Sequence, residues 1–210
     1  SESKPRFKIQ TGENQMTRFH SALIVNDCRT EDFLTMREFV WPIQRNLPIP
    51  SKVVSLSKLN PRDIEGADLV IFSGCQLKDN EYVKLIPKLK WLAKINKPML
   101  GICAGHQIIG AVFGGKLSKV NDPSIGARTM KKTKVHPLTK KLNTSFSVYS
   151  LHGNAVSLPK SFISLAKSKE FANEIIVHST KPIMGVSFHP EVLNKSFFGD
   201  FVAWAEKQSF

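Results

Sequence analysis

Short apolar runs alternate with helix-like segments through the first half of the chain. The runs are bounded by polar or turn-forming residues, as is typical of buried strands, and lie at residues 21–26, 52–56, 67–73 and 98–102. Residues 31–45 and 80–96 are expected to form helices, and in the second of these Tyr82, Leu85, Leu89 and Leu92 have the spacing of one apolar face. Pro42, Pro48 and Pro50 are expected to end the first helix. This alternation predicts an α/β fold with a mostly parallel sheet.

The second half of the chain has a stronger strand pattern. Apolar and β-branched side chains predict strands at residues 145–151, 162–166, 174–179 and 182–188. Residues 195–207 read as a closing helix with aromatic side chains on one face. Residues 1–17 show neither periodicity nor an apolar cluster, which predicts a mobile tail or an expression remnant. Residues 18–210 are then expected to form a single domain.

Composition excludes several classes of protein. Hydrophobic residues make up 41% of the 210, enough for a packed core, so the chain is not of the disordered class. No apolar run approaches the ~18 residues of a membrane span, and no secretory leader pattern precedes the first strand. Cys28, Cys75 and Cys103 are widely spaced and form no C-x-x-C pair. This favours a reducing, cytoplasmic setting without a membrane partner.

The net charge of +13 raises the question of an acidic partner. Lysine supplies 23 of the 30 basic residues and arginine seven, although arginine is the better ligand for phosphates and base edges. We therefore interpret the charge as a solvated lysine-rich surface and expect no nucleic-acid partner. Two denser stretches, residues 84–97 and 131–141, remain candidates for contact with an acidic protein.

A cysteine stands where an apolar strand is expected to turn directly into a helix. Residues 97–110 read K-P-M-L-G-I-C-A-G-H-Q-I-I-G, so Cys103 lies between Gly101 and Gly105 in a G-x-C-x-G pattern. This is the arrangement of a nucleophile elbow, where small neighbours allow a tight turn. The start of the following helix favours a thiolate and points backbone N–H groups at the site. The alternative is a buried structural cysteine in a glycine-rich turn.

A cysteine nucleophile needs a base and a group that orients that base. His189 ends the last predicted strand in G-V-S-F-H-P-E, so it should lie at the same sheet edge as Cys103. Glu191 follows two residues later and can hold the imidazole. An ordinary loop histidine is the alternative for His189, and His152 is expected to stabilise a turn rather than act as a second base.

Together, G-I-C-A-G-H-Q and F-H-P-E resemble the class I glutamine amidotransferases over residues 20–207. The resemblance implies a three-layer, flavodoxin-like α/β fold around a central, mostly parallel sheet. It also implies a Cys103–His189–Glu191 triad. The pattern is most similar to stand-alone, GMP-synthase-like members. Two features depart from it: Ser187 stands where a glutamine is common, and the first strand continues into N-D-C-R.

The resemblance extends to residues around the triad. Backbone N–H groups of Cys75 and Ala104 correspond to the family's oxyanion hole, although Cys75 replaces a glycine there. The substrate-binding positions that it implies are Gln107, Leu151, Gly153 and Asn154. Because the Cys75 turn departs from the usual glycine pair, we expect its N–H to be oriented only when a partner docks.

The implied reaction is hydrolysis of L-glutamine to glutamate and ammonia, with no cofactor and no metal. A zinc site at Cys103, His106 and His189 lacks the usual ligand spacing. The chain contains no G-x-x-x-x-G-K-[ST] phosphate loop, so a separate ammonia-accepting synthetase is the expected partner. Two alternatives remain open at this point: a stand-alone hydrolase of another γ-glutamyl amide, and a non-catalytic regulatory scaffold.

Overall fold

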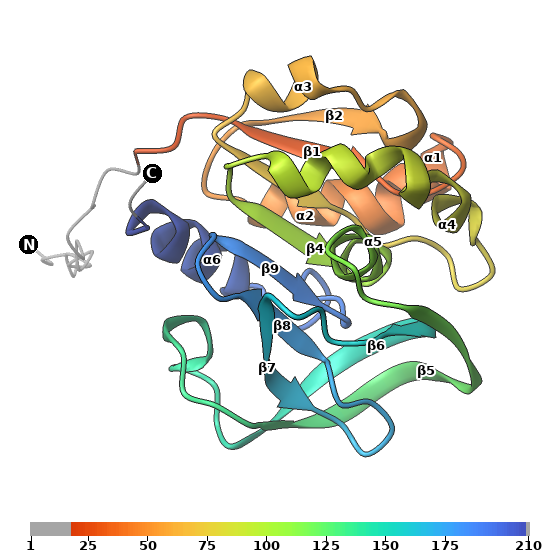
Figure 1. Ribbon diagram of the computed structural model, residues 1–210, viewed down its shortest axis with the longest axis vertical. Helices are drawn as coiled ribbons and strands as arrows, with labels where there is room; N and C mark the ends of the chain where they lie inside the picture. The colour runs from red at the N-terminus through yellow and green to blue at the C-terminus, as the bar shows by residue number, and fades with distance from the viewer. Residues whose placement is uncertain (1–17, 209–210) are drawn as a thin grey trace, which may run out of the picture.

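The computed structural model describes residues 18–208, and the predicted tail at residues 1–17 lies outside this range. A central sheet carries helices on both of its faces (Figure 1). In chain order the elements are β1 (Ala22–Asn26), α1 (Phe33–Thr35), η1 (Met36–Val40), α2 (Trp41–Asn46), β2 (Ser51–Ser55), η2 (Leu56–Lys58), α3 (Pro61–Glu65), β3 (Leu69–Phe72), α4 (Glu81–Leu85), η3 (Ile86–Lys94), β4 (Met99–Ile102), α5 (Ala104–Val112), β5 (Leu117–Lys132), η4 (Pro137–Thr139), β6 (Ser145–Val156), β7 (Phe162–Lys167), β8 (Ile175–His178), β9 (Ile183–Val186) and α6 (Phe197–Glu206).

The nine described strands form one sheet in the order β2-β1-β3-β4-β9-β8-β7-β5-β6. Neighbours from β2 to β9 pair in parallel, and those from β9 to β6 pair antiparallel. Figure 1 shows the antiparallel strands β5 to β8 in the lower part of the molecule, below the helix-covered parallel strands. The predicted parallel sheet is therefore the half that contains the Cys103 turn.

Alternation along the parallel strands fills two cores. In β1, Ala22 and Ile24 pack into one cluster, whereas Leu23 and Val25 pack into the other. The first cluster includes side chains of α2 and α6, and the second includes side chains of α3, η3 and α5. Strands that bury both faces need side chains that are apolar at every position, which explains the continuous apolar runs in the sequence. The three-layer α/β fold predicted from the sequence is confirmed.

The first helical segment has nearly the predicted bounds, but Pro42 does not end it. It runs from Phe33 to Asn46, with Pro42 at the start of α2. Just before that proline the helix widens into a π turn, in which the N–H of Trp41 bonds to the carbonyl of Met36. Pro42 has no N–H to donate, and the π turn immediately before it allows the helical segment to continue to Asn46.

The long strand β5 was not predicted. Its 16 residues pair with β6 through a register shift between Lys119 and Ser124. Most of its side chains are exposed or half-buried, and it includes Pro123 and Gly126, so the sequence has no strand periodicity there. Pairing with β6 determines this strand. Across residues 18–208, no helix has both the length and the apolar character to cross a bilayer.

Candidate active site

Cys103 occupies a strained turn between β4 and α5. Its φ of 51° and ψ of −100° lie in a region that residues other than glycine rarely adopt. The backbone of Cys103 is held against the neighbouring strand β9, because its N–H donates to the carbonyl of Val186 at 2.8 Å. Strain that is held in place by surrounding structure is common at functional sites.

The glycines of the G-x-C-x-G pattern are required by close backbone packing. A Cβ on Gly101 would lie 2.3 Å from the carbonyl oxygen of Gly105, and one on Gly105 would lie 2.5 Å from the carbonyl oxygen of Phe72. Any larger residue at either position would push α5 away from the sheet. The turn therefore depends on both glycines, as the sequence predicted.

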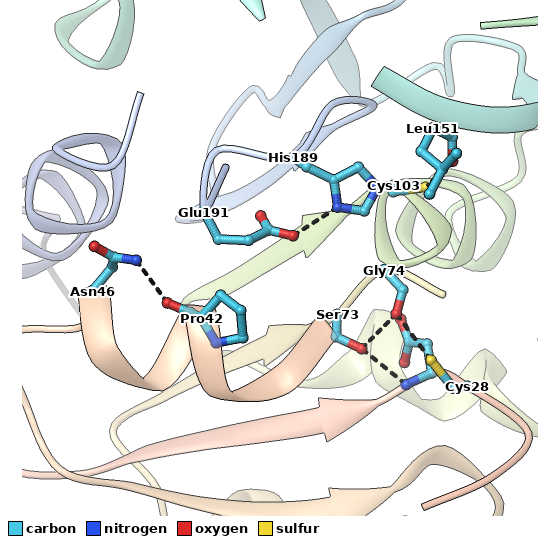
Figure 2. A network of polar contacts seen from close by, with 10 residues as sticks. Cys28, Pro42, Asn46, Ser73, Gly74, Cys103, Leu151, His189 and Glu191 are labelled. Atoms are coloured by element: carbon cyan, nitrogen blue, oxygen red, sulfur yellow. Dashed lines mark hydrogen bonds and ion pairs between the residues drawn. The ribbon is translucent and has the colours of Figure 1, made fainter. Parts of the chain in front are cut away.

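His189 follows β9, the strand that pairs in parallel with β4. Its Nδ1 donates to Oε1 of Glu191 at 2.6 Å, and both side chains are buried. Figure 2 shows the imidazole between Glu191 and Cys103. The backbone N–H of His189 donates to the carbonyl of Tyr149 at 2.8 Å, which fixes the main chain of His189 against β6. The structure thus brings together Cys103, His189 and Glu191 at one sheet edge.

The electrostatic setting favours a charged imidazole. Burial alone lowers the pKa of His189, but the Glu191 carboxylate and then the Cys103 sulfur raise it well above its ordinary value. The Nε2 atom of His189 has no hydrogen-bond partner among the described residues. An imidazolium beside a sulfur atom can stabilise a thiolate and later deliver a proton.

The other predicted site residues line a small cavity together with Cys103. Its lining includes Cys103, the predicted oxyanion and substrate positions and neighbouring side chains: Cys75, Gln76, Leu77, Asp79, Asn80, Tyr82, Ala104, Gln107, Leu151, His152, Gly153 and Asn154. The Cys103 thiol donates to the carbonyl of Leu151 at 3.3 Å. Within residues 18–208, the backbone N–H groups of Cys75 and Ala104 form no hydrogen bond to a protein acceptor.

A polar network closes this cavity to about 10 Å³, roughly the space of one water molecule. Asn154 Nδ2 donates at 2.8 Å both to Asn80 Oδ1 and to the Tyr82 hydroxyl. That hydroxyl in turn donates to Gln107 Oε1, and Gln107 Nε2 donates to the Asn154 carbonyl at 3.0 Å. A ligand the size of an amino acid can enter only if the α4 side and the β6 side of this network separate.

Sequence reasoning missed several polar residues at the site. Tyr82 was interpreted as an apolar position on a helix, and its pairing with Gln107 had no signal in the sequence. Asp27 is buried, and neither of its carboxylate oxygens has a hydrogen-bond partner within residues 18–208. Burial, and second the charge of Cys103, raise the pKa of Asp27 well above its ordinary value. Its position after the first predicted strand was the available clue, because strand ends share an edge.

The two nearby histidines are neutral. Burial, and second the charge of His152, lower the pKa of His106 to about 3. Burial lowers the pKa of His152 to about 4, and its Nδ1 lies 3.1 Å from the carbonyl of Asn154. Among residues 18–208, no three His, Cys, Asp or Glu side chains form a group that could hold a metal ion.

Comparison with known proteins agrees with this geometry. Residues 41–202 match the sequence profile of the class I glutamine amidotransferases. The chain is 33% identical over 132 residues to a subunit of the glutamine-hydrolyzing GMP synthase of Sulfolobus acidocaldarius, covering 62% of this chain and 70% of that protein. It is 30% identical over 167 residues to the corresponding subunit of Thermoplasma acidophilum, covering 76% and 80%.

Solved structures share the fold. A candidate GMP synthase subunit from Thermoplasma acidophilum superposes with a TM-score of 0.78 at 24% identity, covering 89% of this chain and 94% of that one. A glutamine amidotransferase from Thermotoga maritima gives a TM-score of 0.63 at 22% identity, covering 82% and 76%. From the family profile and the two sequence relatives, we conclude that this chain belongs to the class I glutamine amidotransferases.

Proposed function

We propose that this amidotransferase hydrolyses L-glutamine with Cys103 as nucleophile, His189 as acid and base, and Glu191 as the group that orients His189. The observation that carries the proposal is the strained turn that places Cys103 beside an imidazole whose far nitrogen is bonded to Glu191 at 2.6 Å. Nucleophile, base and orienting group in this order are what acyl transfer through a covalent intermediate requires.

In the first half of the reaction, the Cys103 thiolate attacks the side-chain amide carbon of glutamine and forms a C–S bond. The C–N bond then breaks as His189 gives its proton to the leaving nitrogen, which departs as ammonia. In the second half, His189 takes a proton from water while the water oxygen attacks the γ-glutamyl thioester. The C–S bond breaks, and glutamate and the thiolate are released.

The proposed oxyanion donors are the backbone N–H groups of Cys75 and Ala104, which are free of recorded protein acceptors and line the cavity with Cys103. Gln107, Leu151, Gly153 and Asn154 are proposed to hold the amino-acid end of glutamine. Because Tyr82 occupies Gln107 Oε1, the Gln107 amide presents N–H rather than an acceptor, which suits the substrate carboxylate.

We also propose that the ammonia serves a separate synthetase subunit. The support is that the relatives from Sulfolobus and Thermoplasma are themselves subunits of glutamine-hydrolyzing GMP synthases. Exposed cations at Lys88, Lys90 and Lys94 on η3 offer an acidic partner a steering surface. Lys97 and Lys84 are less available, because Lys97 bonds to backbone carbonyls and Lys84 pairs with Glu81.

The test is glutamate release by the purified chain with glutamine and, in parallel, with other γ-glutamyl amides. We expect slow turnover of glutamine, loss of about a thousand-fold or more in Cys103→Ala and His189→Asn, and a smaller loss in Glu191→Gln. Adding the GMP synthetase subunit of the same organism with its substrates should raise the rate, less so at high salt. Equal loss in His152→Asn and His189→Asn, or preference for another γ-glutamyl amide, would contradict the proposal.

A further inference from the structure

The peptide that links Gly74 to Cys75 has a defined orientation at the edge of the site. Its carbonyl oxygen accepts from the Ser73 hydroxyl at 2.9 Å and from the Cys28 thiol at 3.4 Å (Figure 2). In a trans peptide, the carbonyl and the following N–H point in opposite directions. The N–H of Cys75 therefore points away from Ser73 and Cys28.

The opposite side of this peptide is the side of the nucleophile. A Cβ on Gly74 would lie 3.3 Å from the Cβ of Cys103 and 2.4 Å from Cε1 of His189, so the turn runs directly against both. Cys75 and Cys103 line the same cavity. Because the carbonyl is directed to Ser73 and Cys28, the Cys75 N–H is directed to the side on which Figure 2 shows Cys103 and His189.

The two donors to the carbonyl are themselves held from β1. The Ser73 hydroxyl oxygen accepts from the backbone N–H of Asp27 at 3.1 Å, which leaves its hydrogen for the Gly74 carbonyl. Cys28 is placed by a turn in which its N–H donates to Asn26 Oδ1 at 3.1 Å. Burial, followed by the charge of Asp27, raises the pKa of the Cys28 thiol, so it stays protonated and remains a donor.

Ser73 also connects this peptide to the other proposed oxyanion donor. Its backbone carbonyl accepts from the N–H of Gly105 at 3.1 Å, in the first turn of α5. The N–H of Ala104, one residue earlier, is thereby kept at a fixed position relative to the Gly74–Cys75 peptide. One residue at the end of β3 thus holds both sides of the proposed oxyanion hole.

We infer that Ser73 and Cys28 are positioning residues that hold the Cys75 N–H toward the oxyanion, so the oxyanion hole is formed before any partner binds. This differs from the expectation that docking would be needed to orient Cys75. The inference rests on the proposed function, because it assigns these residues a part in glutamine hydrolysis. Neither side chain lies in the lining of the cavity, so both act through the backbone of Cys75.

The experiment compares Ser73→Ala, Cys28→Ala and Cys28→Ser with the unmodified full-length chain. Steady-state glutamate release gives kcat and KM, and mass spectrometry follows alkylation of Cys103 by iodoacetamide, which forms no oxyanion. We expect kcat to fall about ten-fold or more in Ser73→Ala and less in Cys28→Ala. KM should stay within about three-fold, and the alkylation rate should be unchanged. Cys28→Ser, which keeps a donor, should retain more activity than Cys28→Ala.

A matched control is Ser179→Ala, which removes a hydroxyl bonded to the Ser161 carbonyl at 3.0 Å, outside the site. It should have the kcat of the unmodified chain. An unchanged kcat in Ser73→Ala overturns the inference, as does a parallel fall of kcat, affinity and alkylation rate, which would indicate general disruption. An unmodified chain that releases no glutamate but is alkylated at Cys103 would instead overturn the proposed function.

Discussion

Gly74 lacks a side chain because the imidazole of His189 occupies the place where a Cβ would be. The separation would be 2.4 Å, which is far inside van der Waals contact. The backbone of Gly74 has no positive φ, so space rather than conformation demands glycine here. At the residue scale, the site therefore depends on glycines at positions of close contact. Gly101 and Gly105 allow α5 to pack on the sheet, and Gly74 leaves room for the His189 ring.

The change Gly74→Ala should displace the His189 ring and weaken its alignment with Cys103. Misplacement of a reacting group by about 1 Å can cost about a hundred-fold in rate, so we expect kcat to fall at least ten-fold. Steady-state glutamate release measures kcat of the Gly74→Ala variant and of the unmodified chain. Gly199→Ala is the matched control, because a Cβ on this helical glycine meets no atom within 4 Å. Equal activity in the two variants would show that His189 tolerates the added methyl group.

Two elements close over Cys103. The N-terminal end of α4 and the C-terminal part of β6 meet through the hydrogen bond between Asn80 and Asn154, and Cys103 lies beneath with 3% of its surface exposed. Substrate binding must break this contact, so part of the binding free energy is spent on opening. The closed cavity, rather than a misaligned oxyanion donor, is then the physical reason for the slow turnover that we expect of the isolated chain.

Replacing Asn80 with alanine should make opening easier. A hydrogen bond of this kind contributes about 0.5–1.5 kcal/mol, so KM for glutamine should fall about two- to ten-fold with little change in kcat. Iodoacetamide should also reach Cys103 faster, as measured by mass spectrometry. Asn143→Ala, at an exposed position, serves as the control. A raised KM in Asn80→Ala would indicate that Asn80 binds substrate instead of restraining the entrance.

At the scale of the whole molecule, folding buries histidines in their neutral form, although the same side chains would bind a proton in water below about pH 6.5. His106 has a folded-state pKa of about 3 because burial, then His152, disfavours its charged form. Its ring packs against β9, where a Cβ on Gly185 would lie 2.7 Å from the ring. Since its unfolded pKa is about 6.5, the unfolded chain binds a proton below that pH that the folded chain does not. His106 therefore reduces stability as pH falls from 6.5 toward 3.

The variant His106→Gln removes this proton uptake. It should be less stable than the unmodified chain at pH 7.5, but the difference should shrink by about 2 kcal/mol at pH 5. Urea unfolding at both pH values measures the difference in the free energy of unfolding between the variant and the unmodified chain. This difference should be constant between pH 7.5 and 9. If the variant does not fold, NMR titration of the His106 ring in the unmodified chain replaces it. A ring that titrates near 6.5 would contradict the prediction.

The sequence by itself determined the layered fold and which sheet edge holds the proposed reacting groups. Continuous apolar runs predicted the parallel strands. Residues that follow such strands must meet at one edge, which placed Cys103 near His189 although they are far apart in the chain. Gly101 and Gly105 predicted the tight turn at Cys103 between a strand and a helix. These features are local patterns or direct consequences of parallel pairing, so they could be predicted without coordinates.

Tertiary structure alone decided what depends on contacts between distant segments. Strand β5 has no periodicity of its own and forms by pairing with β6. The link from Tyr82 to Gln107 and the bond from Asn80 to Asn154 join segments that no pattern connects. The direction of the Cys75 N–H depends on side chains from β1 and β3. A peptide plane can turn without changing the sequence pattern, and only its hydrogen-bond partners fix which way it faces.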